Sequence, residues 1–343
     1  MKIIVDAFGG DNSPVEIVKG CAEALGEHDD LEIILTGPKD RIEACAKENN
    51  IDLTSDKLSI EDCDDFLTME DEPMAVRKRK TSSMAVGLKM LADGKGDAFL
   101  SAGNSGALIA GATLIVKKIK GVSRPAFSPV IPKSPGMFML IDGGANADCK
   151  PEMLRQFAIM GSVYMERVMG IEKPRVGLAN VGTEHHKGDT LHREAYAMLK
   201  ETPVNFVGNV EGTQIPFDSC DVVVADGFTG NLILKTYEGA ALAVMTRIKN
   251  IYKKSLKNKL SALMIAGDLK KLKGEMNSDV YGGAPILGAS KPVFKVHGNA
   301  TAVTVRHAVR VTMNYVNTNV IEEIEKTVAE LKEKENEDGG EKE

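Results

Sequence analysis

The sequence lacks paired cysteines, long apolar runs and an excess of positive charge. Its five cysteines are scattered without a C-x-x-C pair, which is typical of reduced thiols and argues against a zinc ribbon or a disulfide framework. No stretch approaches the ~18 consecutive apolar residues of a membrane-spanning helix. With 43 Lys and Arg against 49 Asp and Glu, the net charge is -6, so the overall charge does not favour nucleic acid as a partner. We therefore expect a cytoplasmic protein that does not bind nucleic acid.

The sequence also lacks the motifs of several common enzyme classes. Neither G-x-x-x-x-G-K-[ST] nor G-x-G-x-x-G is present, which argues against an NTPase phosphate loop and against the usual dinucleotide fingerprint. His185, His186 and His192 have no H-E-x-x-H motif or matching cysteine set beside them, so we expect no metal and no organic cofactor. Cys149 follows a glycine-rich loop, but no histidine stands where it would activate the thiol as a nucleophile.

What the sequence does contain is a repeated order of short β-branched runs, glycine-rich turns and helical stretches. This order is typical of a mostly parallel sheet covered by helices. The expected strands are residues 2–6, 31–35, 97–102, 137–142, 175–181, 221–227 and 292–298. We therefore predict an α/β fold with a doubly wound, mostly parallel sheet, and we expect residues 1–320 to form a single large α/β catalytic domain.

The first of these units shows the pattern clearly. Residues 2–6 predict a buried strand, and the glycines after it permit a turn. Ser13, Pro14 and Glu16 then fit the N-cap, N1 and N3 positions of a helix that begins with a capping box.

A basic, amphipathic segment follows in the second half of the chain. Residues 249–273 contain eight lysines and one acid, and apolar residues recur there at helical spacing. This pattern predicts a protruding helical hairpin over residues 239–275. Its lysines and leucines fit contact with anionic lipid, contact with an acidic carrier protein, or a dimer interface with solvated lysines. The expected contact residues are Lys253, Lys254, Leu256, Lys257 and Leu260.

The end of the chain is acidic. From Glu322 onward there are ten acids and four lysines. Ile321, Ile324, Val328 and Leu331 have the spacing of one last helix. We therefore expect residues 321–343 to form an acidic helix and tail that is partly disordered.

Five glycine-rich loops follow expected strands, where ligands bind in open α/β sheets. They are SAGNSGA (101–107), DGGANAD (142–148), NVGTEHHKG (180–188), DGFTGN (226–231) and VHGNA (296–300). Glycine lets the backbone approach a ligand closely, so five such loops favour a phosphate-bearing ligand over simple turns. Asp6, Asp142 and Asp226 each end a strand, where a carboxylate binds Mg²⁺ or caps the following loop; we expect capping.

Together, these segments resemble the PlsX family of phosphate acyltransferases. The matching segments are DAFGGD (6–11), SAGNSGAL (101–108), GANAD (144–148), FAIMGSVY (157–164), VGTEHHKG (181–188), DGFTGN with LKTYEG (226–239), YGGAPILG (281–288) and KVHG (295–298). The resemblance runs to about residue 316 and implies an isocitrate/isopropylmalate dehydrogenase-like fold and a homodimer. It also implies transfer of a long acyl chain from acyl carrier protein to inorganic phosphate. A membrane glycerol-3-phosphate acyltransferase would then use the acyl phosphate for phospholipid synthesis, which suits peripheral association with the inner face of the cell membrane.

The resemblance implies Lys187 and Asn231 as the catalytic residues. Phosphate is partly dianionic near pH 7 and a thiolate leaves with little acid assistance, so the reaction needs placement of phosphate and stabilisation of an oxyanion. Lys187 would hold phosphate or the oxyanion, and Asn231 would donate a hydrogen bond. The phosphopantetheine thioester of the carrier is then a co-substrate. Further expected substrate or phosphate contacts are Asp6, Gly9, Gly10, Asn104, Ser105, Asn146, Gly182, Thr229 and His297.

Two other functions stay open on the sequence. A phosphate acetyl- or butyryltransferase that depends on coenzyme A would need the same phosphate site but another acyl donor. A non-enzymatic scaffold on a lipid surface would need only the basic hairpin. In that case the five polar loops would have no role.

Overall fold

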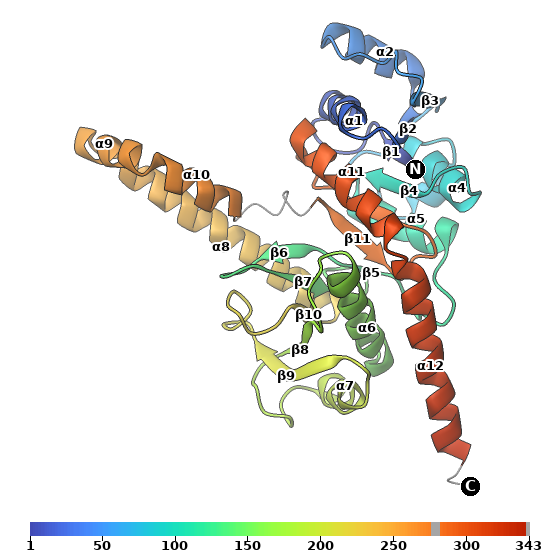
Figure 1. Ribbon diagram of the computed structural model, residues 1–343, viewed down its shortest axis with the longest axis vertical. Coiled ribbons are helices and arrows are strands. Elements are labelled where there is room, and N and C mark those ends of the chain that lie inside the picture. Colours follow the sequence, from blue (N-terminus) through green and yellow to red (C-terminus); the bar gives the residue numbers. More distant parts are fainter. Residues whose placement is uncertain (276–281, 341–343) are drawn as a thin grey trace.

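The computed structural model describes residues 1–275 and 282–340 (Figure 1). The strands in these residues are β1 (Lys2–Asp6), β2 (Glu32–Gly37), β3 (Leu58–Asp62), β4 (Ala98–Ser101), β5 (Ala126–Phe127), β6 (Val130–Pro132), β7 (Met137–Ile141), β8 (Arg175–Asn180), β9 (Asn205–Glu211), β10 (Val222–Val224), β11 (Ala284–Leu287) and β12 (Val293–Lys295). The helices are α1 (Val15–Glu27), α2 (Lys39–Glu48), α3 (Ala75–Lys78), α4 (Ser83–Ala92), α5 (Ser105–Gly111), the π-helical η1 (Ala112–Val116), α6 (Pro151–Arg167), α7 (Thr190–Lys200), α8 (Gly227–Lys253), α9 (Leu256–Met264), α10 (Ala266–Glu275), α11 (Ala302–Asn317) and α12 (Val320–Gly340).

These strands form two sheets. One has the order β3-β2-β1-β4-β12-β11-β5 and the other β6-β7-β10-β8-β9, and most neighbours in both are parallel. Helices α1, α4 and α11 pack around the first sheet, and α6 and α7 pack against the second (Figure 1). The carboxyl ends of the central parallel strands therefore form one edge in each sheet, from which the glycine-rich loops emerge.

All seven strands expected from the sequence are present, but the expectation of one doubly wound sheet is corrected to two sheets. The division occurs at β5 and β6, where the chain leaves the first sheet and enters the second after Ser128 and Pro129. Strands of two or three residues have too few positions to show a periodic pattern, so the sequence does not reveal this crossing. That residues 1–320 form a single domain stays a prediction.

The capping box expected at α1 is absent, and the glutamate of that motif caps a different helix. Pro14 occupies the N-cap position, and the hydroxyl of Ser13 donates to the carbonyl oxygen of Gly10. The carboxylate of Glu16 accepts a hydrogen bond of 2.6 Å from the backbone N–H of Ala302, the first residue of α11. Glu16 thus joins α1 to the first turn of α11. A cap of this kind stabilises a helix by about 1 kcal/mol.

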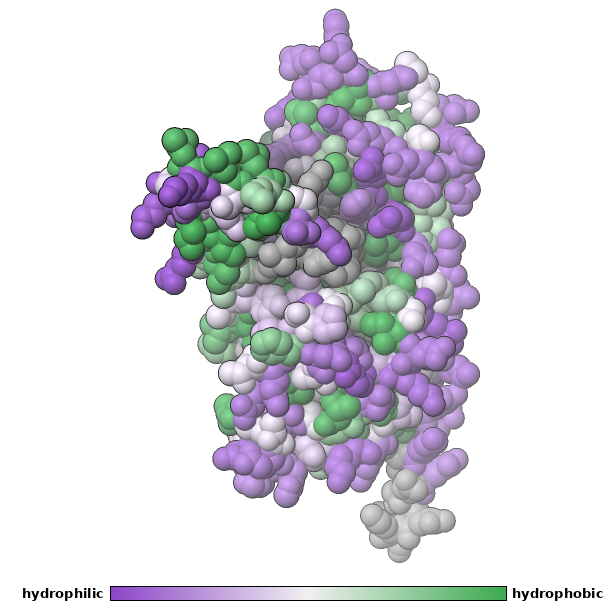
Figure 2. Space-filling view, turned by 60° about the vertical axis from the view of Figure 1, so that its left-hand side comes forward, coloured by the Kyte–Doolittle hydropathy of each residue, from purple (hydrophilic) through white to green (hydrophobic). Residues whose placement is uncertain are grey.

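The predicted hairpin is present as α8, α9 and α10, which project from the body of the protein (Figure 1). The 27 residues of α8 extend for about 40 Å. Ser255 begins α9 by accepting a hydrogen bond from the N–H of Asn258. Apolar side chains gather on the outer part of the hairpin among lysines (Figure 2), and Leu256 is 78% exposed. The hairpin thus presents apolar and basic groups together to solvent.

The acidic C-terminal segment forms the helix expected for it. In α12, Val320, Ile324, Val328 and Leu331 are buried in the main core, while Ile321 is only partly buried. Residues 341–343, at the end of the predicted tail, lie outside the described residues. No described helix has both the length and the apolarity needed to span a membrane.

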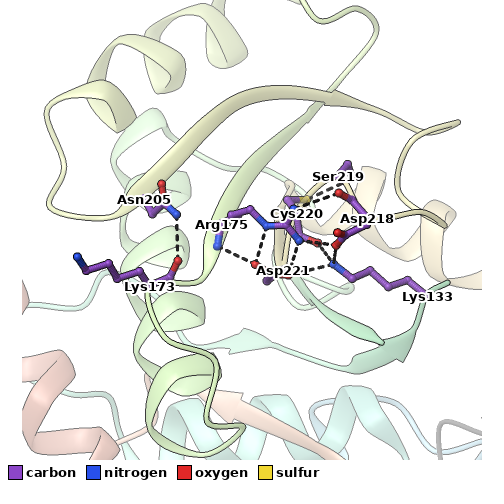
Figure 3. A network of polar contacts seen from close by, with 8 residues as sticks. All are labelled: Lys133, Lys173, Arg175, Asn205, Asp218, Ser219, Cys220 and Asp221. Carbon is purple, nitrogen blue, oxygen red and sulfur yellow. Dashed lines mark hydrogen bonds and ion pairs between the residues drawn. The ribbon is translucent and has the colours of Figure 1, made fainter. Parts of the chain in front are cut away.

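A buried ion-pair network lies where β6 ends and β8 and β10 begin (Figure 3). The Asp221 carboxylate lies 3.0 Å from the Lys133 Nζ and accepts hydrogen bonds from the backbone N–H and the side chain of Arg175. Asp218 accepts from the same two side chains but is 56% exposed. Burial by itself would raise the pKa of Asp221, but the hydrogen bonds from Arg175 and Lys133 outweigh it and hold that pKa well below its usual range.

Asp221→Asn should lower the free energy of unfolding by about 2–3 kcal/mol at pH 7, because Asp221 is the buried carboxylate that pairs with both Lys133 and Arg175, whereas Asp218 is 56% exposed. The folded-state pKa of Asp221 is depressed, so its contribution is complete above the unfolded pKa of about 4 and is lost as the pH falls below it. Urea unfolding of both proteins from pH 7 to pH 3 measures this difference. Asp218→Asn is the matched control, and an equal loss in both variants would contradict the argument.

Candidate functional site

The loops after β1, β4 and β12 meet at the carboxyl edge of the first sheet. The N–H of Asp11 donates to the carbonyl oxygen of Gly298 at 2.7 Å, which joins the β1 and β12 loops. Gly9 packs against the β4 loop so closely that a Cβ added to it would lie 2.5 Å from the backbone nitrogen of Gly103. Gly10 approaches Gly298 in the same way. These loops therefore meet at one edge of the first sheet, and Gly9 and Gly10 serve the packing between them.

Asp6 ends β1 inside the protein and is 2% exposed. Its carboxylate accepts hydrogen bonds from the hydroxyls of Ser83 and Ser101, at 2.6 and 2.7 Å, and from the N–H of Phe8. Burial raises the pKa of Asp6, while these hydrogen bonds and the positive charge of Lys295 act in the opposite direction. The carboxylate therefore shapes the loops around it. Its predicted contact with phosphate stays a prediction.

Lys295 is a buried cation that our sequence analysis did not select. Its Nζ donates to the carbonyl oxygen of Ala102 at 2.7 Å and also to that of Gly103. Burial lowers the pKa of Lys295 to about 8, although the charges of Asp6 and Asp11 act to raise it. The sequence signal for it is a lysine at the end of an otherwise apolar strand, in the KVHG segment whose expected contact is His297. His297 itself is exposed in the loop after β12.

Of the two phosphate contacts expected at the start of α5, Asn104 forms hydrogen bonds within the protein. The side chain of Asn104 accepts a hydrogen bond from the N–H of Ala107 and donates to the carbonyl oxygens of Met69 and Asp71. Ser105 follows as the first residue of α5 and is half-buried. Asn104 therefore fixes α5 to the segment before α3, and contact of either residue with phosphate stays a prediction.

The loop after β7 is organised by the fully buried Asp142. Its carboxylate accepts hydrogen bonds from the backbone N–H groups of Gly144, Ala145, Asn146 and Phe127. Burial raises the pKa of Asp142, and these donors oppose the shift. At the end of β10, Asp226 accepts from the N–H of Thr229 and caps α8. The expectation that these strand-end aspartates cap the following loops is confirmed.

The loops after β7 and β10 bring Asn231, Asn146 and Thr229 to one place. The carbonyl oxygen of Asn146 accepts a hydrogen bond of 2.7 Å from the N–H of Gly227, at the start of α8. A Cβ built on Gly144 would lie 3.2 Å from the Cβ of Asn231. Asn231 is exposed in the second turn of α8, so its carboxamide is open to a ligand beside the Gly144 loop.

Lys187 lies in the loop after β8, the strand next to β10. Its side chain packs along the buried Gly182, and its carbonyl oxygen accepts a hydrogen bond from Asn180. Lys187 is exposed. No hydrogen bond in residues 1–275 and 282–340 joins Lys187 to Asn231, although neighbouring parallel strands place their loops at the same edge. Joint action of the two side chains stays a prediction.

The environment of Cys149 does not favour a thiolate nucleophile. Burial raises the pKa of this thiol to about 12, and the negative charges of Asp142 and Asp226 act in the same direction. Within the part of the chain that the structure describes, no group of three or more His, Cys, Asp or Glu side chains is arranged to hold a metal ion.

A pocket of about 450 Å³ lies between the elements of the first sheet and the loop after β7. Its walls come from Pro73 and Met74 before α3, from α5 and η1, from Arg124 and Pro125, and from the Gly144–Asn146 segment. Its volume is in the range of small-molecule sites in proteins. Gly144 lines this pocket and also adjoins Asn231, so the pocket and the site at the start of α8 share the Gly144 segment.

The fold is that of the phosphotransacetylases. A phosphotransacetylase from Streptococcus pyogenes superposes with a TM-score of 0.61 and 17% identity, over 92% of this chain and 94% of that one. The EutD phosphotransacetylase from Staphylococcus aureus gives a TM-score of 0.58 and 16% identity, with the same coverage of both chains. At such low identity, this likeness establishes the class of fold alone.

The sequence defines the family within this class. The model of the fatty acid synthesis protein family matches residues 1–323. A phosphate acyltransferase from Acetivibrio thermocellus is 46% identical over 325 residues, which are 94% of this chain and 95% of the relative. One from Caldanaerobacter subterraneus is 44% identical over 336 residues, or 96% and 99%. The chain belongs to the fatty acid synthesis protein family, the PlsX-type phosphate acyltransferases, and the resemblance seen in its motifs is confirmed.

Proposed function

We propose that the protein reversibly transfers a long-chain acyl group from acyl carrier protein to inorganic phosphate, which gives an acyl phosphate for phosphatidic acid and phospholipid synthesis. The observation that carries this proposal is the position of Asn231. It is an exposed carboxamide beside Gly144, where Asp142 and Asp226 are engaged as loop caps and the Cys149 thiol is not activated. Such a site suits a reaction that needs placement more than proton transfer.

The reaction follows from this arrangement. A phosphate oxygen attacks the thioester carbonyl carbon, so that a C–O bond forms and the carbonyl oxygen becomes an oxyanion. The C–S bond then breaks, and the phosphopantetheine thiolate leaves. The Asn231 carboxamide donates to the oxyanion, and the Lys187 ammonium holds phosphate opposite the thioester. The Lys295 ammonium donates a hydrogen bond to the Ala102 carbonyl oxygen and so fixes the position of the loop after β4.

A donor comparison tests this function. The purified protein is incubated with phosphate and one of palmitoyl carrier protein, palmitoyl-coenzyme A or acetyl-coenzyme A, and both free thiol and acyl phosphate are measured. We expect rapid release of free thiol, with formation of acyl phosphate, from palmitoyl carrier protein alone. Preference for a coenzyme A donor would favour the phosphate acetyl- or butyryltransferase reading, and no product from any donor would reject the enzyme function.

We further propose that the protein is a homodimer with an isocitrate/isopropylmalate dehydrogenase-like fold, in the cytoplasm and at the inner face of the cell membrane. The exposed apolar side chains of α8 and α9 support both an interface and a lipid contact. The downstream partner would be a membrane glycerol-3-phosphate acyltransferase, which uses the acyl phosphate. Light scattering of the purified protein tests the dimer, for which we expect about twice the mass of the 36.9 kDa chain.

Changing Lys253, Lys254 and Lys257 to glutamine should weaken binding to anionic vesicles about 100-fold, because each lysine near such a surface contributes about 1 kcal/mol. These lysines are exposed on the hairpin, beside Leu256 and Leu260. Flotation with phosphatidylserine vesicles at low salt measures the effect. Val303→Gln, at an exposed site on α11, is the control. Unchanged flotation with a higher KM for the carrier protein would instead assign the lysines to carrier binding.

A further inference from the structure

The pocket between α5 and the loop after β7 has an apolar wall. Ile109 and Ala110 on α5 and Leu114 on η1 line it, and Met74 faces them from the segment before α3. Leu114 is 46% exposed and Met74 is 40% exposed, so two large apolar side chains of this wall are open to solvent. An apolar ligand would cover them and remove this surface from water.

The local backbone keeps this wall apolar. The residues after α5 form one π-helical segment, Ala112–Val116, and such segments occur often at functional sites. The Thr113 hydroxyl donates to the Ile109 carbonyl oxygen at 2.9 Å, so this polar group on the wall is already satisfied within the helix. The hydroxyl therefore does not require a polar group of a ligand as its partner.

The rim of the pocket carries one cation. Arg124 is exposed and forms no hydrogen bond or ion pair with any described residue. Opposite it, Asn146 donates to the carbonyl oxygen of Pro125 and to Asp142, so its amide is engaged. An apolar wall with one unpaired guanidinium at its rim is complementary to a ligand with a long apolar tail and an anionic head.

The pocket adjoins the loop segment that also contacts the proposed reaction site. Gly144 lines the pocket and lies against Asn231. A ligand whose reacting carbonyl is beside Asn231 therefore has this pocket close by for an attached chain.

We propose that this pocket holds the fatty acyl chain of the donor and of the acyl phosphate product, with the tail along α5 and η1, the reacting carbonyl towards Asn231, and Arg124 at the rim for the anionic phosphate of the product. This inference rests on the proposed function and extends it, because it makes the residues of one wall determine the acyl-chain length. Ala110 and Leu114 then limit the chains that the enzyme accepts.

Ala110→Trp and Leu114→Trp test the proposal, because a larger side chain shortens the pocket. With a series of acyl carrier proteins from butyryl to stearoyl, we expect kcat/KM for palmitoyl to fall at least 10-fold while that for butyryl stays within 3-fold. Leu114 is already exposed, so its replacement preserves a folded protein. Val303→Trp, at an exposed site on α11, is the control and should leave the whole profile unchanged. Equal losses at every chain length, or no change in profile, would overturn the assignment.

A binding measurement separates failure of this inference from failure of the proposed function. The probe is cis-parinaric acid, a fluorescent long-chain fatty acid with an anionic head, and it requires no turnover. We expect at least 10-fold weaker binding by Leu114→Trp and by Arg124→Gln, and unchanged binding by Val303→Trp. Wild-type protein that binds the probe at this pocket but forms no acyl phosphate would reject the function and keep the pocket. Probe binding that none of these variants affects would reject the pocket.

Discussion

Gly230→Ala should reduce acyl-phosphate formation at least 100-fold and lower the free energy of unfolding by about 3 kcal/mol. A Cβ at this position would lie well within 3.0 Å of the carbonyl oxygen of Asp142, and its nearest neighbours are all backbone atoms, so there is no flexible side chain that could move away. The start of α8 would have to shift from the β7 loop. Asn231, one residue further on, would shift with it, so stability and activity should fall together.

Gly239→Ala on the same helix is the matched control. No heavy atom lies within 4 Å of a Cβ added at Gly239, which is exposed in the interior of α8. Alanine there should raise the free energy of unfolding by about 0.5–1 kcal/mol, because glycine is the poorer helix former. Urea unfolding and the palmitoyl carrier assay on both variants measure the effects. Activity above half of wild type in Gly230→Ala would show that the contact between the two loops does not position Asn231.

The sequence predicted much of this site because its signals are local. Strands β1 and β10 appear as short β-branched runs and β7 and β8 as short apolar runs, and the aspartates at or just after the ends of β1, β7 and β10 cap the loops that follow. Gly9 and Gly230 lie where two backbone segments approach closely. The sequence shows a glycine at each of these positions but does not show which segment it contacts. Amphipathic spacing likewise revealed the hairpin and α12.

What the sequence could not predict depends on contacts between distant residues. Glu16 has the spacing of a local cap, but its carboxylate reaches the start of α11, 286 positions along the chain. Lys295 stands in an apolar strand, and its role becomes visible only when the carbonyl oxygens of the β4 loop are brought to it. The division into two sheets depends on β5, which pairs with the remote strand β11, while β6 pairs with the next strand, β7. Local patterns contain no information about such partners.

Lys187→Ala and Asn231→Ala should each reduce acyl-phosphate formation by about 10²- to 10³-fold while the protein stays folded. Both side chains are exposed, so removing them leaves no cavity and no buried unpaired group. If Lys187 holds phosphate, its loss should mainly raise KM for phosphate; if Asn231 donates to the oxyanion, its loss should mainly lower kcat. Lys200→Ala and Asn250→Ala, at exposed helical positions, are the matched controls.

The double variant decides whether the two side chains act on the same transition state. When two groups act on the same transition state, removing both lowers activity by less than the product of the two separate fold-losses. We therefore expect the double variant to be about as impaired as the worse single variant. Fully additive losses would indicate two independent sites, in agreement with the absence of a described bond between Lys187 and Asn231. Near-normal activity in both single variants would remove these residues from the mechanism and leave Lys295 and the Asp142 loop as the groups to test next.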